Sequence, residues 1–493
     1  DTVKGVLIEA VTTSDLGIVT AAGGAAFFAG IGGIYVYNEI GDSTSVQIGK
    51  LDATDTVRIN ETLTQTARDF FGSTTGRDDK DLTGGVQIIA RAANVTDTVA
   101  IAAGIGAGAG GLPIVTNFMA SSADVTLTEP TIVARTDDIA IGAQVTTRLN
   151  SLLVGGAVGG GAVGLAIGVN EIDTSATLTL TGATIDASFG ANDVILAASR
   201  EIDLTSISVG AAAGGIAGGG AVQVSTLGGM TSIATDRTAD TKTSIKSGGD
   251  LQIGALTQSS VVGTAVGATV GGVGGANSSN VLKLNGDTVV NMRGDTLADA
   301  EDDLAVVALA EREITSKGGA VALTGTVGAG FGLDYIALNE AARVDLGNNT
   351  QIFAGDDVII SAVGGDEVES VVTSGSAGFF AASLSLGILD IGGASDRDSD
   401  QADILARAET SIETDQSKDA KAEGDETDVD EGNSASNLAG LAGGDAQLAK
   451  SVTRRAQISL DGATAAHGAS IKIGRAAHIA GDEVRRSRLV RRP

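Results

Sequence analysis

The chain has 493 residues, of which 71 are Gly, 3 are Pro and none is Trp or Cys, and its formal net charge is −29. The lack of Cys excludes disulfides and thiolate zinc sites, and the acidic balance argues against nucleic-acid binding, which needs a basic surface. Because 43% of the residues are hydrophobic, the chain is too apolar to be disordered, and we expect a core of Val, Ile, Leu and Ala. The longest apolar runs are rich in Gly, which disfavours helix, so no transmembrane segment is predicted.

A short motif recurs along the chain, in the order acidic residue or Gly, apolar residue, any residue, apolar residue, any residue, Ala. Its copies start near residues 5, 85, 138, 193, 250, 303 and 357, with a looser copy near Asp403. The alternation of apolar residues predicts a strand with one buried face. The copies from Asp138 to Asp357 lie 53 to 57 residues apart, so we predict about eight repeats of roughly 54 residues over residues 1–480.

A second landmark follows each motif start after 30 to 36 residues, where a Gly-rich apolar stretch ends. Four units carry an Asn there, and the others carry Thr, Asp or an Asn at a shorter spacing from the motif start. The Asn residues are Asn38, Asn117, Asn170 and Asn339, and the equivalent places hold Thr226, Asn280 and Asp390. Asn tolerates the left-handed backbone of a corner, and stacked Asn side chains can bond between neighbouring coils. We therefore predict structural corner residues, with a binding role as the alternative.

The strands within a unit suggest how it folds. The Gly-rich stretch carries small apolar residues on both faces, as in Gly159 to Val169, which predicts a strand closely approached from both sides. Alternating Thr and Leu in Ala176 to Thr181 predict a further strand with one wet face. We interpret a unit with three or more strands as two or three coils of an all-β solenoid. At about 4.8 Å per coil, the rod would be about 75–115 Å long.

Two segments interrupt the period. The first is a surplus of residues at about 52–83, which includes Asp55 to Phe71, a sequence compatible with a short helix. We interpret this surplus as a loop excursion, with an extra coil or a separate domain as alternatives. The second is the strongly acidic segment 396–433, which we predict to be a loop.

The acidic segment opens with Asp396, Asp398, Asp400 and Asp403, a spacing that resembles a calcium loop. An EF-hand is excluded because Gln401 stands where the required Gly belongs and Arg407 stands where the bidentate Glu belongs. A looser surface calcium site at these four Asp residues and a solvated acidic loop remain the two alternatives. Calcium is the one cofactor that the sequence suggests.

The C-terminal segment 481–493 is basic and includes Arg485, Arg486 and Arg488. An acidic body with a basic end predicts head-to-tail contacts between copies of the chain, which would propagate a filament. The alternative is a linker that continues into further repeats of a longer adhesin.

No catalytic constellation is recognisable. His467 and His478 belong to no Ser/His/Asp or metal-ligand pattern, and the Asp pairs at Asp137 and Asp356 recur at one repeat position, which indicates turns before strands. We therefore predict that the chain is not an enzyme.

The repeats resemble those of the large repetitive surface adhesins of Gram-negative bacteria, of the filamentous-haemagglutinin type and of the type related to fusobacterial filamentous adhesins. The likeness rests on the Asp-Val-x-Ile-x-Ala strand and on the segment from Gly168 to Ile172, and it covers about residues 5–480. It implies a right-handed parallel β-helix, export to the cell surface, and a role in attachment to cell-surface glycans or proteins or in self-assembly. A calcium-ordered S-layer-like or matrix array and a carbohydrate-active β-helix enzyme are the other hypotheses.

Overall fold

The computed structural model describes residues 6–49, 58–61, 85–135 and 137–391, together with short segments of the C-terminal region. These segments are 447–449, 452–453, 456–459, 468–473, 478–480 and 483–485. The described residues form strands and connecting turns and contain no helix. The predicted all-β parallel solenoid is confirmed.

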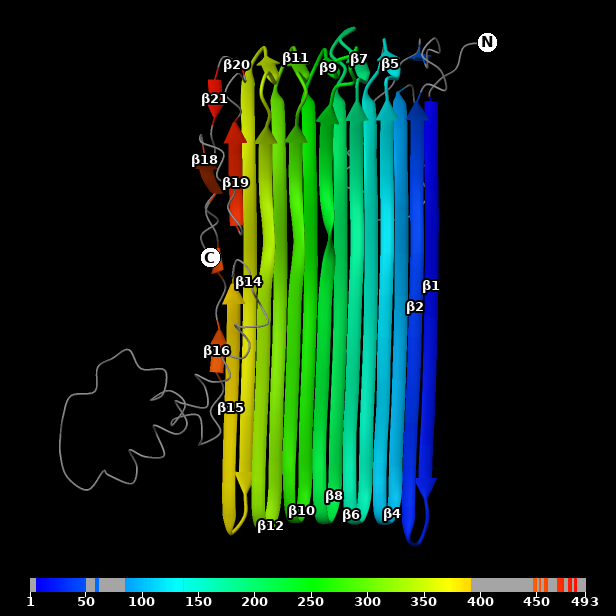
Figure 1. Cartoon of the computed structure of the whole chain (residues 1–493), viewed down its shortest axis with the longest axis vertical. Coiled ribbons are helices and arrows are strands. Elements are labelled where there is room, and N and C mark those ends of the chain that lie inside the picture. Colours follow the sequence, from blue (N-terminus) through cyan, green and yellow to red (C-terminus); the bar gives the residue numbers. More distant parts are fainter. Residues whose placement is uncertain are drawn as a thin grey trace, which may run out of the picture.

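Each coil is a long strand that descends, turns back at a Gly-rich tip and ascends, followed by a short strand that closes the opposite end (Figure 1). In five coils the two arms are one continuous strand: β4 (Val86–Thr128), β6 (Ile139–Thr181), β8 (Val194–Asp236), β10 (Leu251–Met292) and β12 (Leu304–Leu346). In the first and seventh coils the arms are separate strands: β1 (Val6–Ala25), β2 (Ala29–Gly49), β14 (Asp357–Ala377) and β15 (Phe380–Ile391).

The short strands form a second sheet, the cap sheet, at the end opposite the tips (Figure 1). They are β3 (Arg58–Glu61), β5 (Thr131–Ala134), β7 (Thr184–Ala187), β9 (Ser244–Ser247), β11 (Leu297–Ala300), β13 (Gln351–Ala354) and β20 (His478–Ala480). The remaining C-terminal strands are β16 (Gln447–Ala449), β17 (Val452–Thr453), β18 (Ala456–Ser459), β19 (Gly468–Ile473) and β21 (Glu483–Arg485).

The register shows that one repeat makes one coil. The start of β4 at Val86 pairs with Ile139, and Ile139 pairs in turn with Val194, each partner lying one full repeat along the chain. The prediction of two or three coils per repeat is therefore wrong, because each arm runs for about 20 residues without a turn. Seven stacked coils extend only about 34 Å along the stack, whereas an arm of this length extends about 65 Å, so the slab is taller than it is long.

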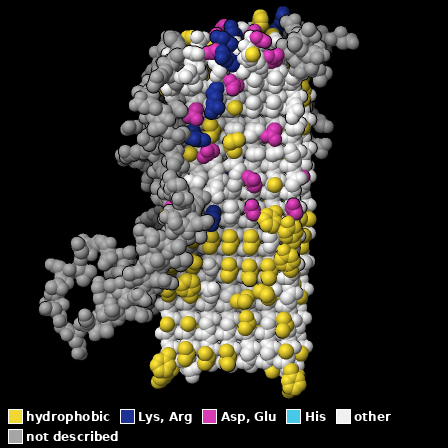
Figure 2. All heavy atoms as spheres, in the orientation of Figure 1, with side chains coloured by type: hydrophobic (Ala, Val, Ile, Leu, Met, Phe, Trp, Pro, Cys, Tyr) yellow, Lys and Arg dark blue, Asp and Glu magenta, His cyan; other side chains and the backbone are white. Residues whose placement is uncertain are grey.

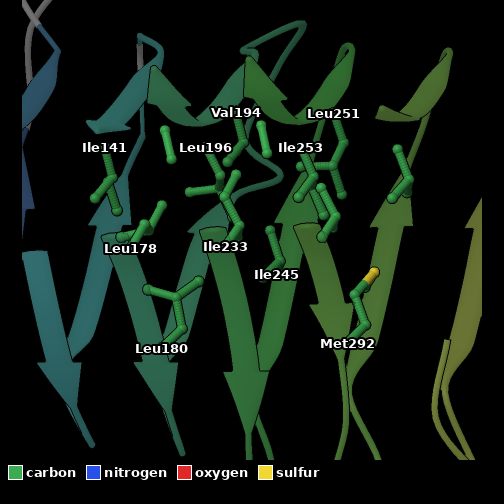
Figure 3. Close-up of a cluster of buried hydrophobic side chains, with 14 of the residues drawn as sticks. Ile141, Leu178, Leu180, Val194, Leu196, Ile233, Ile245, Leu251, Ile253 and Met292 are labelled. Carbon is green, nitrogen blue, oxygen red and sulfur yellow. The ribbon is translucent and has the colours of Figure 1, made fainter. Parts of the chain in front are cut away.

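The apolar core lies between the arms beneath the cap sheet. Inward-facing side chains of the repeat motif, such as Ile141, Leu196 and Ile253, pack there against Leu178 of an ascending arm and Ile245 of the cap strand β9 (Figure 3). These side chains are at most 1% exposed. The period-2 pattern of the motif thus produces the interior in the way the sequence predicts.

The Asp that opens the motif connects neighbouring coils. The backbone N–H of Asp193 donates to Asp138 Oδ1 at 2.7 Å, and that of Asp250 donates to Asp193 Oδ1 at 2.8 Å. Asp303 and Asp357 continue the series at 3.2 and 3.0 Å. Each carboxylate therefore satisfies a backbone donor of the next coil, which explains why an Asp recurs directly before the strand.

The irregular segments are only partly described. Arg58–Glu61 form strand β3, which pairs with β5, so the short helix expected within Asp55 to Phe71 is wrong for these four residues. The rest of the surplus, residues 52–57 and 62–83, and the whole acidic segment 396–433 lie outside the described residues. After β15 ends, the seventh coil continues at β19, which pairs with the end of β12, and β21 then pairs with Asp357–Ile359.

Candidate functional site

Three of the predicted Asn residues form a hydrogen-bonded row through neighbouring coils. Asn38 Nδ2 donates to Asn117 Oδ1 at 2.6 Å, and Asn117 Nδ2 donates to Asn170 Oδ1 at 2.7 Å. All three side chains are at most 3% exposed. They lie within the ascending arms and not at a turn, so the corner assignment is wrong, while the side-chain contact between coils is present because one repeat is one coil.

Asn339 does not belong to this row. The register continues from Asn170 to Ser225, Leu282 and Ile336, and Asn339 lies three positions further along β12, opposite Asn285. Asn280 lies in a neighbouring row, opposite Asp334. Spacing from the motif start does not identify equivalent positions here, because a register shift between Gly271 and Val273 displaces the ascending arm of β12 relative to β10.

The half of the solenoid nearest the tips, which we call the tip half, has an interior of mainly small side chains. Ala and Gly fill most of it, together with Val115 and Leu153, and buried Ser, Thr, Asn, Gln and Asp side chains lie among them. Ser208 Oγ donates to Gln223 Oε1 at 2.7 Å, and Ser316 Oγ donates to Asp334 Oδ1 at 2.5 Å. Burial raises the pKa of Asp334, and the hydrogen bonds from Ser316 and Ser370 oppose this shift.

Four buried charges form a cluster between the apolar core and a second apolar cluster around Leu204 and Leu338. The charge cluster consists of Arg200, Arg312, Glu340 and Asp366, each at most 4% exposed. Glu340 pairs with both arginines, with Nη2 of Arg200 at 3.4 Å, and Arg312 also pairs with Asp366. The cluster is electrically neutral, which is the condition for charges to persist inside a fold.

Glycines make room for the long side chains of this cluster. A Cβ on Gly286 would lie 3.0 Å from both Arg200 Nη2 and Glu340 Oε1, and Gly229 has a φ of +122° that favours Gly. Arg200 Nη1 also donates to the Gly228 carbonyl at 3.0 Å. Sequence reasoning missed the cluster, although period-2 alternation places Arg200 on the same inward face as Leu196 and Ile202 and could have revealed it.

The outer surface of the tip half is largely apolar on both faces, with Asn277 and Lys317 among its exposed polar side chains. Its exposed side chains include Ile101, Ile105, Val158, Val163, Leu165, Ile216, Val270, Val321, Leu323, Val327 and Phe331. In Figure 2 the acidic and basic side chains gather towards the cap sheet, and hydrophobic side chains cover the visible face near the tips. We call this surface the apolar belt; it surrounds the small apolar and polar side chains that fill the interior of the tip half.

The first coil leaves its interior open. Among the described residues, β1 and β2 pair with β4 alone, so each has an unpaired edge along 20 or 21 residues. Ile8 and Ile18 are only partly buried, whereas Ile88, one coil inwards from Ile8, is fully buried. Among the described residues, no strand covers the backbone donors and the apolar side chains at this end of the stack.

Both end coils carry a Phe-Phe pair at the tip, where the inner coils have no aromatic residue; Phe380, for example, pairs with Val327. Phe27 and Phe28 are 86% and 79% exposed, and Phe379 and Phe380 are 81% and 66% exposed. Within each pair the rings meet edge to face, at centroid separations of 5.1 and 5.0 Å. Sequence reasoning missed these pairs, although each interrupts a run of Gly and Ala.

The predicted calcium residues Asp396, Asp398, Asp400 and Asp403 and the residue His467 lie outside the described residues, and His478 lies in β20. In the part of the chain that the structure describes, no group of His, Asp or Glu is arranged to hold a metal ion. No helix among the described residues is long and apolar enough to cross a membrane.

Comparison of the chain with protein-family models, with curated proteins and with solved structures gives no match. The geometry of the coils is therefore the basis for the function proposed below.

Proposed function

We propose that the chain is a structural, non-enzymatic module of an extracellular rod or filament at a bacterial surface. Copies stack end to end, the first coil of one on the last coil of another, and the resulting filament serves attachment or self-assembly. The observation that carries this proposal is the open first coil, with two long strand edges and a partly exposed interior.

An edge strand is a template for a further strand, and proteins that remain monomeric usually block their edges with charge, Pro or a covering segment. The descending arm β1 has Glu9 and Asp15 as its acidic residues, and from Leu16 to Ala25 it has no charge at all. Such an edge favours pairing with another copy.

The opposite end of the stack offers a matching edge. Strands β16, β17 and β21 pair with β14 only between Asp357 and Val372, away from the tip. Among the described strands, β15 pairs with β12 alone. Stacking β1 and β2 on this tip-proximal edge would bring Phe27 and Phe28 of one copy about 4.8 Å along the stack from Phe379 and Phe380 of the next.

The proposal is tested with the double variant Phe27→Ser/Phe28→Ser. We expect the wild-type protein to form rods or oligomers in negative-stain images and in size-exclusion chromatography with light scattering, and the variant to dissociate. The control is Phe189→Ser, which removes a 45% exposed ring from the connection between β7 and β8 in an inner coil. A wild-type protein that stays monomeric at all concentrations, or equal loss of assembly in both variants, would overturn the proposal.

The same assembly measurements, repeated at raised salt and with a calcium chelator, separate the other hypotheses. The basic segment 486–493 lies outside the described residues, and if it meets the acidic body of another copy, assembly weakens as salt rises. Assembly that dissolves when calcium is chelated would favour the calcium-ordered array.

A further inference from the structure

The apolar belt needs a partner that covers two opposite faces at once. Seven coils at about 4.8 Å and about nine residues per arm at about 3.3 Å give each face roughly 1,000 Å², more than the ~300–600 Å² of the largest apolar patch on a typical monomeric protein. The belt continues around the tips, because the inner tips carry no charge and consist mostly of Gly, Ala, Val and Ile, with Thr324 and Thr326 in the sixth coil. A second copy would cover one face and leave the other exposed.

The height of the belt is defined most clearly in the third coil. From Leu152 to Val169 every outward-facing residue is apolar or Gly, and the tip lies at Gly160, so each arm contributes about nine residues. At about 3.3 Å per residue this is ~30 Å, the thickness of the hydrocarbon core of a bilayer. The charge-free stretch around each tip is 16 to 32 residues long throughout the seven coils.

Tyrosines mark the border of the belt. The chain has three Tyr residues, and Tyr37 and Tyr335 lie in the same row across the coils as Val169, the last apolar outward residue of the third coil. Tyr35 lies two residues nearer the tip. The next outward-facing row, two residues further from the tip, contains the charged residues Glu39, Glu171 and Lys283. Tyr at the junction of an apolar and a charged zone is typical of proteins in contact with the interface of a bilayer.

The interior of the tip half is consistent with such surroundings. Polar side chains of Ser208, Gln223 and Ser316 face inwards and bond to one another or to Asp334, so the outer surface presents none of them. In water a solenoid gains stability by burying its large apolar side chains, as beneath its own cap sheet, whereas in the tip half many large apolar side chains face outwards and mainly Ala, Gly and polar residues face inwards.

We propose that the tip half inserts, tips first, into the hydrocarbon layer of a lipid bilayer, with the Tyr row at the interface and the cap sheet in water. This inference rests on the end-to-end stacking proposed above, because lipid cannot satisfy the open edges of β1 and β2. Copies stacked in a bilayer pair those edges with each other.

The test uses flotation of the purified chain with phosphatidylcholine vesicles, which carry no net charge. Leu165→Lys places a charge on the outer face of β6, five residues from Gly160 and so about 16 Å into the belt. Ser175→Lys places the same charge on the same face of the same arm, on the side of Glu171 away from the tip. We expect the wild type and Ser175→Lys to float with the vesicles, and Leu165→Lys to lose binding by about 30-fold or more.

A second readout gives the depth. Because the chain has no Trp, Leu165→Trp and Ser175→Trp each introduce a single fluorophore, and phosphatidylcholine brominated on its acyl chains should quench the first and not the second. A wild type that does not float, or equal quenching at both sites, would overturn the inference. Association in lipid-free buffer that Leu165→Lys abolishes, without vesicle binding, would assign the belt to a second copy instead.

The two proposals fail in different ways. Rods that assemble in buffer but do not float refute lipid insertion and leave the stacking intact. Flotation of a chain that stays monomeric on the vesicles, by cross-linking, refutes the stacking.

Discussion

Replacing Glu340 by Gln tests the buried charge cluster, because this carboxylate joins Arg200 to Arg312. The variant leaves Arg200 with neutral acceptors only and gives the cluster a net positive charge in the interior. Burial already lowers the pKa of Arg200, and the Glu340 carboxylate opposes this shift, so its loss leaves the desolvation of the guanidinium uncompensated. Breaking a buried ion pair by removing one partner costs about 3–5 kcal/mol of folding free energy.

The control is an ion pair at the surface of the same slab. Arg148 Nε lies 3.1 Å from Asp203 Oδ2, and the two side chains are 54% and 39% exposed. Solvent screens this pair, so Asp203→Asn should cost less than about 1 kcal/mol. Urea denaturation followed by far-ultraviolet circular dichroism, in one buffer, compares the two variants with the wild type.

A loss in Glu340→Gln no larger than that in Asp203→Asn would refute the reasoning. A further variant with Arg200→Leu, Arg312→Met, Glu340→Leu and Asp366→Leu removes all four charges together. If desolvation is the main cost, this variant should be as stable as the wild type to within about 1 kcal/mol, or more stable.

Three further predictions follow from the interior. Burial raises the pKa of Asp334 in the folded chain, so the wild type loses stability as pH rises from the unfolded pKa near 4 to the folded pKa. Over that range the stability of Asp334→Asn should increase relative to that of the wild type. A difference in urea midpoint between the two proteins that does not change with pH would contradict this. Gly155→Ala puts a Cβ 2.0 Å from the Leu165 carbonyl and should prevent the arms from closing, whereas the neighbouring Gly156→Ala meets nothing within 4 Å and should melt as the wild type does. Asn117→Leu leaves the buried amides of Asn38 and Asn170 short of a partner, and thermal unfolding should show a loss of about 1–3 kcal/mol, while an unchanged melting temperature would rule out a stabilising row.

The sequence predicts the fold class and the period well, because both depend on local pattern. The apolar alternation after Asp138 or Asp193 needs no knowledge of distant residues, and it recurs in phase with the coils. The number of coils per repeat depends on where the chain turns. The Gly-rich pattern from Gly159 predicts a strand interior, but Gly159–Gly161 form the tip, because Gly serves both where backbones approach closely and where they reverse.

The candidate surfaces were less predictable because they arise from comparison between coils. Tyr37 and Tyr335 lie almost 300 residues apart in sequence, and only the register places them in one row. In the same way, the link between Arg200 and Glu340 spans 140 residues and depends on the gap at Gly286. Alternation alone could reveal that Arg200 faces inwards but not which carboxylate it meets.

The link from Arg200 to Glu340 also has a mechanical consequence. In most repeat proteins each unit touches only its neighbours, so the stack can open one unit at a time from either end. Here Arg200 of the fourth coil reaches past the fifth to Glu340 of the sixth, and Arg312 passes the connection on to Asp366 of the seventh. Under tension along the stack, we expect the first three coils to peel away singly and the last four to resist as one block.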